Sequence, residues 1–359
     1  MANTKSGLVP ECFESVIDGK KTALYVLNNS KGAEMCVCNY GGIIVSIMMP
    51  DRNGEMSNVV LGLSNIEDMT KRVDPYLGAA IGRYGNRIAN GKFTLDGVEY
   101  TLPQNDNTNC LHGGLSGFES KVWEATQTDG QTLVLRYTSV DGEEGFPGNL
   151  SIEMTYTLTD NNEVRIDYKA TTDKLTLCNL TNHSFFNLAG ISGKAEAPVI
   201  TDHVLTLNCD KFIPVDKIAI PVGVKTPVEG TPFDFRQPAL VADRIDDNDT
   251  QIKYGAGIDH SFCINQKNAG ELTLAAVCEC PATGRVLTTY TTEPGLQVYS
   301  GNFLNGTVGV CGTKFPRRSG ICFEAQHHPD CPNQPKFEQC ALAPGQVYNQ
   351  TTIYAFSVK

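Results

Sequence analysis

Between residues 150 and 168 the chain alternates apolar and polar side chains with a period of two. Apolar residues fill every second position from Leu150 to Leu158, a polar turn follows at 160–162, and the alternation resumes from Val164 to Tyr168. This pattern predicts two antiparallel strands in a sheet with one buried face and one face in water. Shorter apolar runs predict further strands at residues 23–27, 35–39, 43–49, 92–95, 98–102, 175–181, 204–207, 272–278, 286–292, 297–300 and 351–356.

Turn signals separate these runs, and one helix start interrupts them. Asn53-Gly54 and Asp96-Gly97 are strong signals for tight hairpins. Ser64 and Glu67 have the spacing of a capping box, which predicts a short helix that ends by residue 75. No composition shift, linker or internal repeat divides the sequence. We therefore expect an all-β fold, a large antiparallel β-sandwich, with residues 1–359 as a single domain and 1–20 as an N-terminal extension.

The formal net charge of −11 narrows the choice of ligand. A strongly acidic chain lacks the basic footprint that nucleic-acid binding needs, and it repels anionic substrates. A neutral small molecule is therefore the expected partner. No apolar run approaches the ~20 residues that span a bilayer, so we expect no association with a membrane.

The 13 cysteines indicate a reducing compartment. At least one of them cannot take part in an intrachain disulfide. Cys36, Cys38, Cys178 and Cys278 lie in strand-like runs, where a free thiol acts as a small hydrophobe. The first ten residues also lack the apolar core of a signal peptide. We expect a cytoplasmic protein that is a monomer or a homodimer.

Common metal and cofactor motifs are missing from the sequence. The spacings of cysteine and histidine do not match a zinc site, and there is neither a phosphate loop nor a Gly-x-Ser-x-Gly nucleophile elbow. The acidic run at 246–249 is interpreted as a solvated turn, with a weak structural calcium site as the alternative. We therefore expect no metal at the site of chemistry.

The segment 182–188 is the first candidate for chemistry, because it places His183 between an amide and two aromatic rings. Strand alternation would put His183 and Phe185 on one face and Ser184 and Phe186 on the other. A ring beside an imidazole on an accessible face suits a sugar, which offers an apolar C–H face and a rim of hydroxyls. The alternative is a core histidine that is paired with a backbone carbonyl.

Glu324 is the second candidate, because it directly follows the apolar residues 321–323. A buried carboxylate is costly unless it has a partner. Three other segments place polar residues in unusual surroundings: arginines at 83–88, a histidine in a glycine turn at 111–114, and an Asp-His pair at 259–260. Each of these, taken alone, is better explained as a turn or a surface ion pair.

Six motifs in order resemble those of the aldose 1-epimerase family, the galactose mutarotases. They lie at residues 82–88 (GRYGNRI), 111–114 (LHGG), 181–188 (TNHSFFNL), 257–260 (GIDH), 293–304 (EPGLQ and GNFL) and 324–330 (EAQ and PD). The resemblance covers residues 25–356. It implies a β-sandwich of the galactose-mutarotase type, an aldose as the small-molecule partner and no organic cofactor.

The resemblance also implies roles for particular residues. His183 would be the general acid and Glu324 the general base. Phe185 replaces the tyrosine often found in the family, so ring stacking is expected without a hydroxyl contact. Ala325 replaces the more usual threonine and lacks its hydrogen bond. The residues expected to hold sugar hydroxyls are Asn86, Arg87, His112, Asp259 and Gln297.

Interconversion of the α and β anomers of glucose or galactose needs two titrating groups in opposite protonation states. One takes the proton of the O1 hydroxyl while the other protonates the ring oxygen. We expect an ionised Glu324 and a protonated His183, with the charge of Asp259 favouring the imidazolium. Two alternatives stay open: a hexose-6-phosphate mutarotase that uses Lys314, Arg317 and Arg318, and a sugar-binding module without catalysis.

Overall fold

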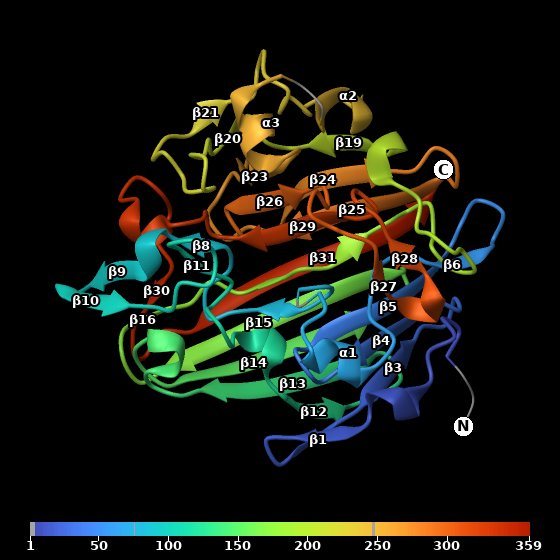
Figure 1. Cartoon of the computed structure of the whole chain (residues 1–359), viewed down its shortest axis with the longest axis horizontal. Helices are drawn as coiled ribbons and strands as arrows, with labels where there is room; N and C mark the ends of the chain where they lie inside the picture. The colour runs from blue at the N-terminus through green and yellow to red at the C-terminus, as the bar shows by residue number, and fades with distance from the viewer. Residues whose placement is uncertain (1–3, 75, 246–247) are drawn as a thin grey trace.

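The computed structural model describes residues 4–74, 76–245 and 248–359, and strands dominate it (Figure 1). Its largest sheet is antiparallel and has the strand order β12-β13-β14-β15-β31-β25-β24-β19-β22. The bounds in that order are Glu124–Gln127, Thr132–Ser139, Leu150–Leu158, Glu163–Thr172, Tyr348–Val358, Arg285–Thr291, Thr273–Glu279, Val204–Leu207 and Ala239–Leu240. In Figure 1 the C-terminal strand β31 runs through the middle of the molecule, beside β15.

A six-stranded antiparallel sheet forms the second layer, with the order β18-β29-β26-β23-β20-β21. Its strands are Phe185–Phe186, Ile321–Gln326, Gly295–Tyr299, Asp259–Cys263, Lys211–Phe212 and Thr226–Pro227. Apolar residues of both sheets share the largest hydrophobic cluster. Contacts also join the two layers directly: the Tyr354 hydroxyl of β31 donates to the Phe323 carbonyl oxygen at 2.7 Å. The predicted antiparallel β-sandwich is therefore confirmed.

A four-stranded sheet and six strand pairs complete the β-structure of the described residues. The sheet consists of β3 (Leu24–Asn28), β4 (Glu34–Cys38), β5 (Ile43–Pro50) and β6 (Met56–Asn58). The pairs are β1 (Ser15–Ile17) with β2 (Lys20–Thr22), β7 (Ala80–Ile81) with β17 (Thr181–Asn182), β8 (Arg87–Ile88) with β11 (Cys110–Leu111), β9 (Lys92–Leu95) with β10 (Val98–Thr101), β16 (Thr176–Leu177) with β30 (Ala341–Leu342), and β27 (Thr307–Val308) with β28 (Lys314–Phe315).

Helices are few and short in the described residues. They are α1 (Ile66–Thr70), α2 (Ala242–Ile245) and α3 (Thr250–Gly255), with 3-10 turns at Pro10–Phe13, Ala89–Gly91, Phe118–Ser120, Glu143–Gly145, Ile200–Asp202, Val310–Gly312 and Cys331–Asn333. None of the helices in the described parts of the chain has the length and apolar character needed to cross a bilayer.

Most of the predicted strands lie within two residues of an observed strand at both ends, among them β14, and both hairpin turns are confirmed. β15 is longer than predicted, since it continues to Thr172 instead of ending at Tyr168. The helix cap was wrong by one residue. Asn65 caps α1 by accepting from the Asp68 backbone N–H at 2.8 Å, while the Ser64 hydroxyl donates to the Gly309 carbonyl oxygen. The predicted strand at 175–181 is also wrong as one element, because its two ends pair with different strands, β30 and β7.

The acidic run at 246–249 is described only in part. Asp246 and Asp247 lie outside the described residues. Asp249 caps α3, since its side chain accepts from the Gln251 backbone N–H. The described part of the predicted N-terminal extension packs against the body of the protein, where Leu8 and Phe13 are buried in the second hydrophobic cluster.

Candidate active site

The six-stranded sheet has one apolar face and one polar face, and the polar face carries the site. Cross-strand pairing aligns Tyr299 with both Cys322 and Asp259, and aligns Gln297 with both Glu324 and Ser261. Because side chains alternate along a strand, these residues all project from the same face. Ala325 projects from the opposite face into the main core. Strand register thus gathers residues that are far apart in the sequence.

A cavity of about 210 Å³ opens on this polar face. It is smaller than the ~300–1,000 Å³ pockets that take drug-sized ligands, which suits a ligand with one sugar ring. A larger hollow of about 840 Å³ lies over strands β12–β15 and holds none of the candidate residues, so we assign the site to the smaller one. The described lining residues are Asp74, Tyr76, Asn86, Arg87, Leu111, His112, His183, Phe185, Asp259, Tyr299, Phe303, Leu304 and Glu324.

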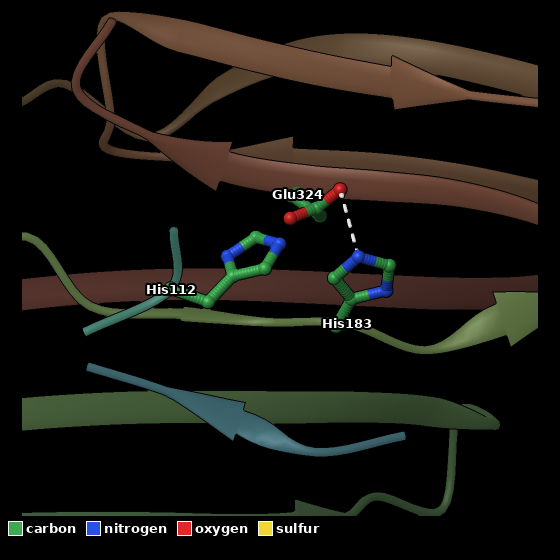
Figure 2. A group of neighbouring side chains, drawn as sticks. All are labelled: His112, His183 and Glu324. Carbon is green, nitrogen blue, oxygen red and sulfur yellow. Dashed lines mark ion pairs between the residues drawn. The ribbon is translucent and has the colours of Figure 1, made fainter. Parts of the chain in front are cut away.

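His183 and Glu324 both line this cavity, and Figure 2 shows their polar atoms facing each other. The distance from His183 Nε2 to Glu324 Oε1 is 3.6 Å, and both side chains are buried. Glu324 comes from β29, whereas His183 lies between β17 and β18. The backbone N–H of His183 donates to the Ala79 carbonyl oxygen at 2.9 Å, and its carbonyl accepts from Gly78 N–H at 3.0 Å. Two backbone hydrogen bonds therefore fix the segment that carries the imidazole.

Aromatic rings surround the imidazole of His183. The Phe185 ring stacks on it at a centroid distance of 4.9 Å, and the Tyr76 ring lies nearly parallel to it at 5.9 Å. Phe186 points the other way and packs against Tyr354 in the main core. The predicted separation of Phe185 and Phe186 onto opposite faces is therefore confirmed.

The protonation states differ from those expected. Burial lowers the pKa of His183 to about 4, against a smaller opposing effect of its own backbone. Burial raises the pKa of Glu324 well above its ordinary range; the charge of Asp259 raises it further, and Arg87 opposes both. Asp259 therefore acts on Glu324, and the prediction that it keeps His183 charged is wrong. In the protein alone, the low dielectric favours a neutral pair with its proton on Glu324.

The carboxyl group of Glu324 can accept a hydrogen bond from a ligand. Its Oε2 atom is buried and has no hydrogen-bond partner within the described parts of the chain. A buried polar atom without a partner is costly. A sugar hydroxyl that donates to Oε2 would remove this cost.

His112 also points its ring into the cavity, toward Glu324 (Figure 2). The Asn86 backbone N–H donates to His112 Nδ1 at 3.1 Å. The proton of the neutral ring therefore sits on Nε2, and burial keeps the ring neutral by lowering its pKa. The turn is tight, because a Cβ atom at Gly113 would lie 2.0 Å from the Gly82 carbonyl oxygen. His112 is thus a fixed hydrogen-bond donor.

Ligand atoms of His112, His183 and Glu324 lie within 4.8 Å of one another, close enough to hold a cation. A metal-bound imidazole needs a lone pair on the ligating nitrogen and donates from the other one. The Asn86 N–H enforces the reverse arrangement on His112. A second cluster contains His203, whose Nε2 accepts from Leu188 N–H and whose Nδ1 contacts Asp202. In the second cluster, hydrogen bonds already occupy both nitrogens of His203.

Arg87 and Asp259 form the charged wall of the cavity. Arg87 Nε donates to Asp106 at 2.7 Å, a partner that the sequence did not indicate. Gln297 Nε2 donates to Asp259 Oδ1 at 2.7 Å, so Gln297 lies behind Asp259 rather than in the described wall. Its direct contact with a sugar hydroxyl stays a prediction.

Several wall residues were not predicted. Tyr299 could have been found, because it lies two residues after Gln297 in a strand and so shares its face. Phe303 and Leu304 belong to the motif at 301–304 but received no role. Leu111, at the end of β11, likewise belongs to the motif at 111–114 but received no role. No sequence pattern marked Asp74 or Tyr76, which enter the wall from loops.

Comparisons with known proteins point to one family. The family model of aldose 1-epimerase matches residues 23–355. Galactose mutarotase from Rattus norvegicus is 44% identical over 323 residues, 90% of each chain. Aldose 1-epimerase from Escherichia coli K12 is 36% identical over 343 residues, 94% of this chain and 96% of the relative.

Among solved structures, the GalM/aldose epimerase homologue from C. elegans has a TM-score of 0.85 at 27% identity, covering 94% of this chain and 99% of its own. The match of the family model over almost the whole chain, together with these relatives, settles the assignment. The chain belongs to the aldose 1-epimerase family.

Proposed function

We propose that this protein is an aldose 1-epimerase, an isomerase that interconverts the α and β anomers of free hexoses such as glucose and galactose. One observation carries the proposal: His183 and Glu324 come from distant parts of the sequence and lie 3.6 Å apart in the wall of one small cavity. The relatives of this chain that are named galactose mutarotase and aldose 1-epimerase also support the proposal.

The reaction needs one proton on the pair. The Glu324 carboxylate takes the O1 proton while His183 protonates the ring oxygen, so the bond between C1 and the ring oxygen breaks. The open aldehyde turns about C1–C2, and the reverse transfers close the ring on the other face. Both groups return to their starting states, so the reaction consumes neither a redox equivalent nor a group carrier.

Binding of the sugar would move the proton from Glu324 to His183. Hydroxyls that donate to the unpaired Oε2 of Glu324 favour its charged form and lower its pKa. The faces of Phe185 and Tyr76 favour the imidazolium over the neutral ring. The substrate would thus create the ion pair that catalyses its own conversion.

The remaining wall residues would hold the sugar. His112 would donate from its fixed Nε2–H, and the hydrogen bond from Arg87 Nε to Asp106 holds the Arg87 guanidinium in place. Asp259, held by Gln297, would accept from hydroxyls. Phe185 would lie against the apolar face of the sugar ring. It lacks the hydroxyl of the tyrosine that is usual in the family.

Polarimetry on freshly dissolved α-D-galactose and α-D-glucose tests the proposal. We expect the protein to speed the change in optical rotation without changing its endpoint. His183→Asn and Glu324→Gln should each abolish the acceleration while the fold is kept. Rates near those of the wild type in both variants would contradict the mechanism.

A hexose-6-phosphate mutarotase would need free cations beside the cavity. Arg317 Nε donates to the Asn302 carbonyl oxygen, the Arg318 guanidinium lies 3.4 Å from the Ile245 carbonyl oxygen, and neither belongs to the described wall. Lys314 is exposed on β28, away from that wall. We therefore expect slower catalysis on glucose 6-phosphate than on glucose.

The second alternative is a sugar-binding module without catalysis. Such a module would bind galactose without changing its rate of anomer exchange.

The proposal extends to the state of the protein in the cell. A single domain over residues 1–359 is supported by β31, the C-terminal strand, which lies between β15 and β25 in the large sheet. A cytoplasmic location is supported by the cysteines, all of which are free thiols. A monomer or homodimer without an organic cofactor completes the proposal.

A further inference from the structure

We propose that Cys322 is a positioning residue, which holds His183 through its Nδ1 atom so that Nε2 alone exchanges the proton. The Cys322 Sγ atom lies 3.6 Å from His183 Nδ1, within hydrogen-bond distance for sulfur, and both side chains are buried. This inference rests on the proposed function, because it gives His183 its part in the acid–base pair.

One strand reaches both nitrogens of the ring. Cys322 and Glu324 are two residues apart on β29 and project from the same face of the sheet. Glu324 faces Nε2, and Cys322 faces Nδ1, each at 3.6 Å. Phe185, which stacks on the imidazole, is paired with Cys322 across the strands β18 and β29. The ring is therefore fixed by neighbours in one rigid element and its cross-strand partner.

The reaction requires one tautomer of His183. After Nε2 has given its proton to the ring oxygen, the neutral ring must keep its other proton on Nδ1, because Nε2 must accept a proton when the sugar closes. In the proposed arrangement the Cys322 thiol points its own S–H away from the ring, and its sulfur accepts this N–H, which favours the required tautomer. Without the acceptor, the proton could settle on Nε2, and the ring could no longer act as the base for closure.

A thiol suits this role better than a carboxylate. Burial raises the pKa of the Cys322 thiol well above its ordinary range, so the group stays uncharged. An uncharged, weak acceptor fixes the tautomer without stabilising the imidazolium as strongly as a carboxylate would. His183 thereby stays acidic enough to give up its proton.

Four variants test the role. Cys322→Ala and Cys322→Val both remove the acceptor, the first with a smaller side chain and the second with a larger one. Cys322→Ser restores an acceptor. Cys278→Ala is the matched control, because Cys278 is a fully buried thiol on β24 in the main core and lies outside the described wall of the cavity. We expect kcat for galactose to fall about 2- to 10-fold in the Ala and Val variants, the effect of losing one neutral hydrogen bond, with little change in KM, and to recover in the Ser variant.

The ¹⁵N chemical shifts of the His183 ring give a readout that does not depend on activity. In the wild type we expect a protonated Nδ1 and an unprotonated Nε2 at neutral pH. In the Ala and Val variants we expect a mixture of tautomers. A wild type with its proton on Nε2, or an unchanged kcat in both the Ala and Val variants, would overturn the role of Cys322. A wild type that does not speed anomer exchange would instead overturn the proposed function, and the nitrogen shifts would still decide the contact.

Discussion

Replacing Glu324 by Gln separates its part in catalysis from its part in stability. The substitution keeps the size of the side chain and removes the base. A placed acid or base group contributes about 10²–10⁴-fold, so kcat should fall by that factor, equivalent to about 3–5 kcal/mol in the barrier. The fold should not suffer, because Glu324 is buried, its Oε2 atom lacks a partner in the described structure, and burial disfavours its charged form.

Glu293→Gln is the matched control, and it should give the opposite pattern. Glu293 is also buried, but its Oε2 atom bonds His327 Nδ1 at 2.7 Å and it is not part of the described wall. Burial alone would lower the pKa of His327, but the charge and hydrogen bond of Glu293 outweigh burial and raise that pKa to about 9.

The shift in the pKa of His327 from 6.5 to about 9 corresponds to roughly 3 kcal/mol of stability. Because the folded-state pKa is raised, this stability is fully present below pH 6.5 and is lost as the pH rises through 9. Glu293→Gln should therefore lower the free energy of unfolding by up to about 3 kcal/mol at pH 6, and by much less at pH 10. Its kcat should stay within a few-fold of the wild type.

Urea unfolding gives the free energy of unfolding of each variant, and polarimetry gives the kcat of each. We expect Glu324→Gln to lose activity and keep stability, and Glu293→Gln to lose stability and keep activity. The reasoning would be refuted by a Glu324→Gln protein with a near-normal kcat, or by one whose activity loss matches a loss of folded protein.

Three further predictions concern the charged groups of the site. The pKa of His183 in the protein without sugar is lowered to about 4, so kcat/KM, which reports the free protein, should fall below about pH 4, where His183 and Glu324 both hold protons; a pH profile of kcat/KM by polarimetry should show this limb, and a limb near pH 6.5 would speak against it. Asp259→Asn removes a charge that raises the pKa of Glu324, so that pKa should fall while the pKa of His183 stays unchanged, as ¹³C and ¹⁵N NMR titrations would show. Arg87→Ala should raise KM for galactose more than it lowers kcat, and Asp106→Asn, which only releases the guanidinium, should raise KM less; equal losses of kcat would contradict a holding role.

Much of the fold could be predicted because its strands follow simple patterns. The alternation at 150–168 marks β14 and β15, and the two dipeptide turns mark their hairpins. Other elements lack such signals. The helices α2 and α3 are only four and six residues long, too short for a periodic pattern. The strand β31 begins at Tyr348, before the apolar run, because polar Gln350 finds buried partners in the fold.

The candidate site was only partly predictable, for a physical reason. The apolar residues before Glu324 indicated a buried carboxylate, and the aromatic neighbours of His183 indicated a ring pocket. That the two groups share one cavity depends on strand register, which no local pattern encodes. Their protonation states depend on burial by the whole fold, so the sequence did not indicate that His183 is neutral in the protein without sugar. Gln297 was recognised, but its place behind Asp259 appears only in three dimensions.

The central claim is that His183 and Glu324 pass protons to and from one bound sugar. NMR exchange spectroscopy on D-galactose at equilibrium tests it most directly, because it measures passage between the anomers when no net reaction occurs. With the wild-type protein we predict exchange cross-peaks between the α and β anomeric protons, and with Glu324→Gln we predict none above the uncatalysed level. A wild type that binds galactose and leaves this exchange at the uncatalysed level would contradict the claim.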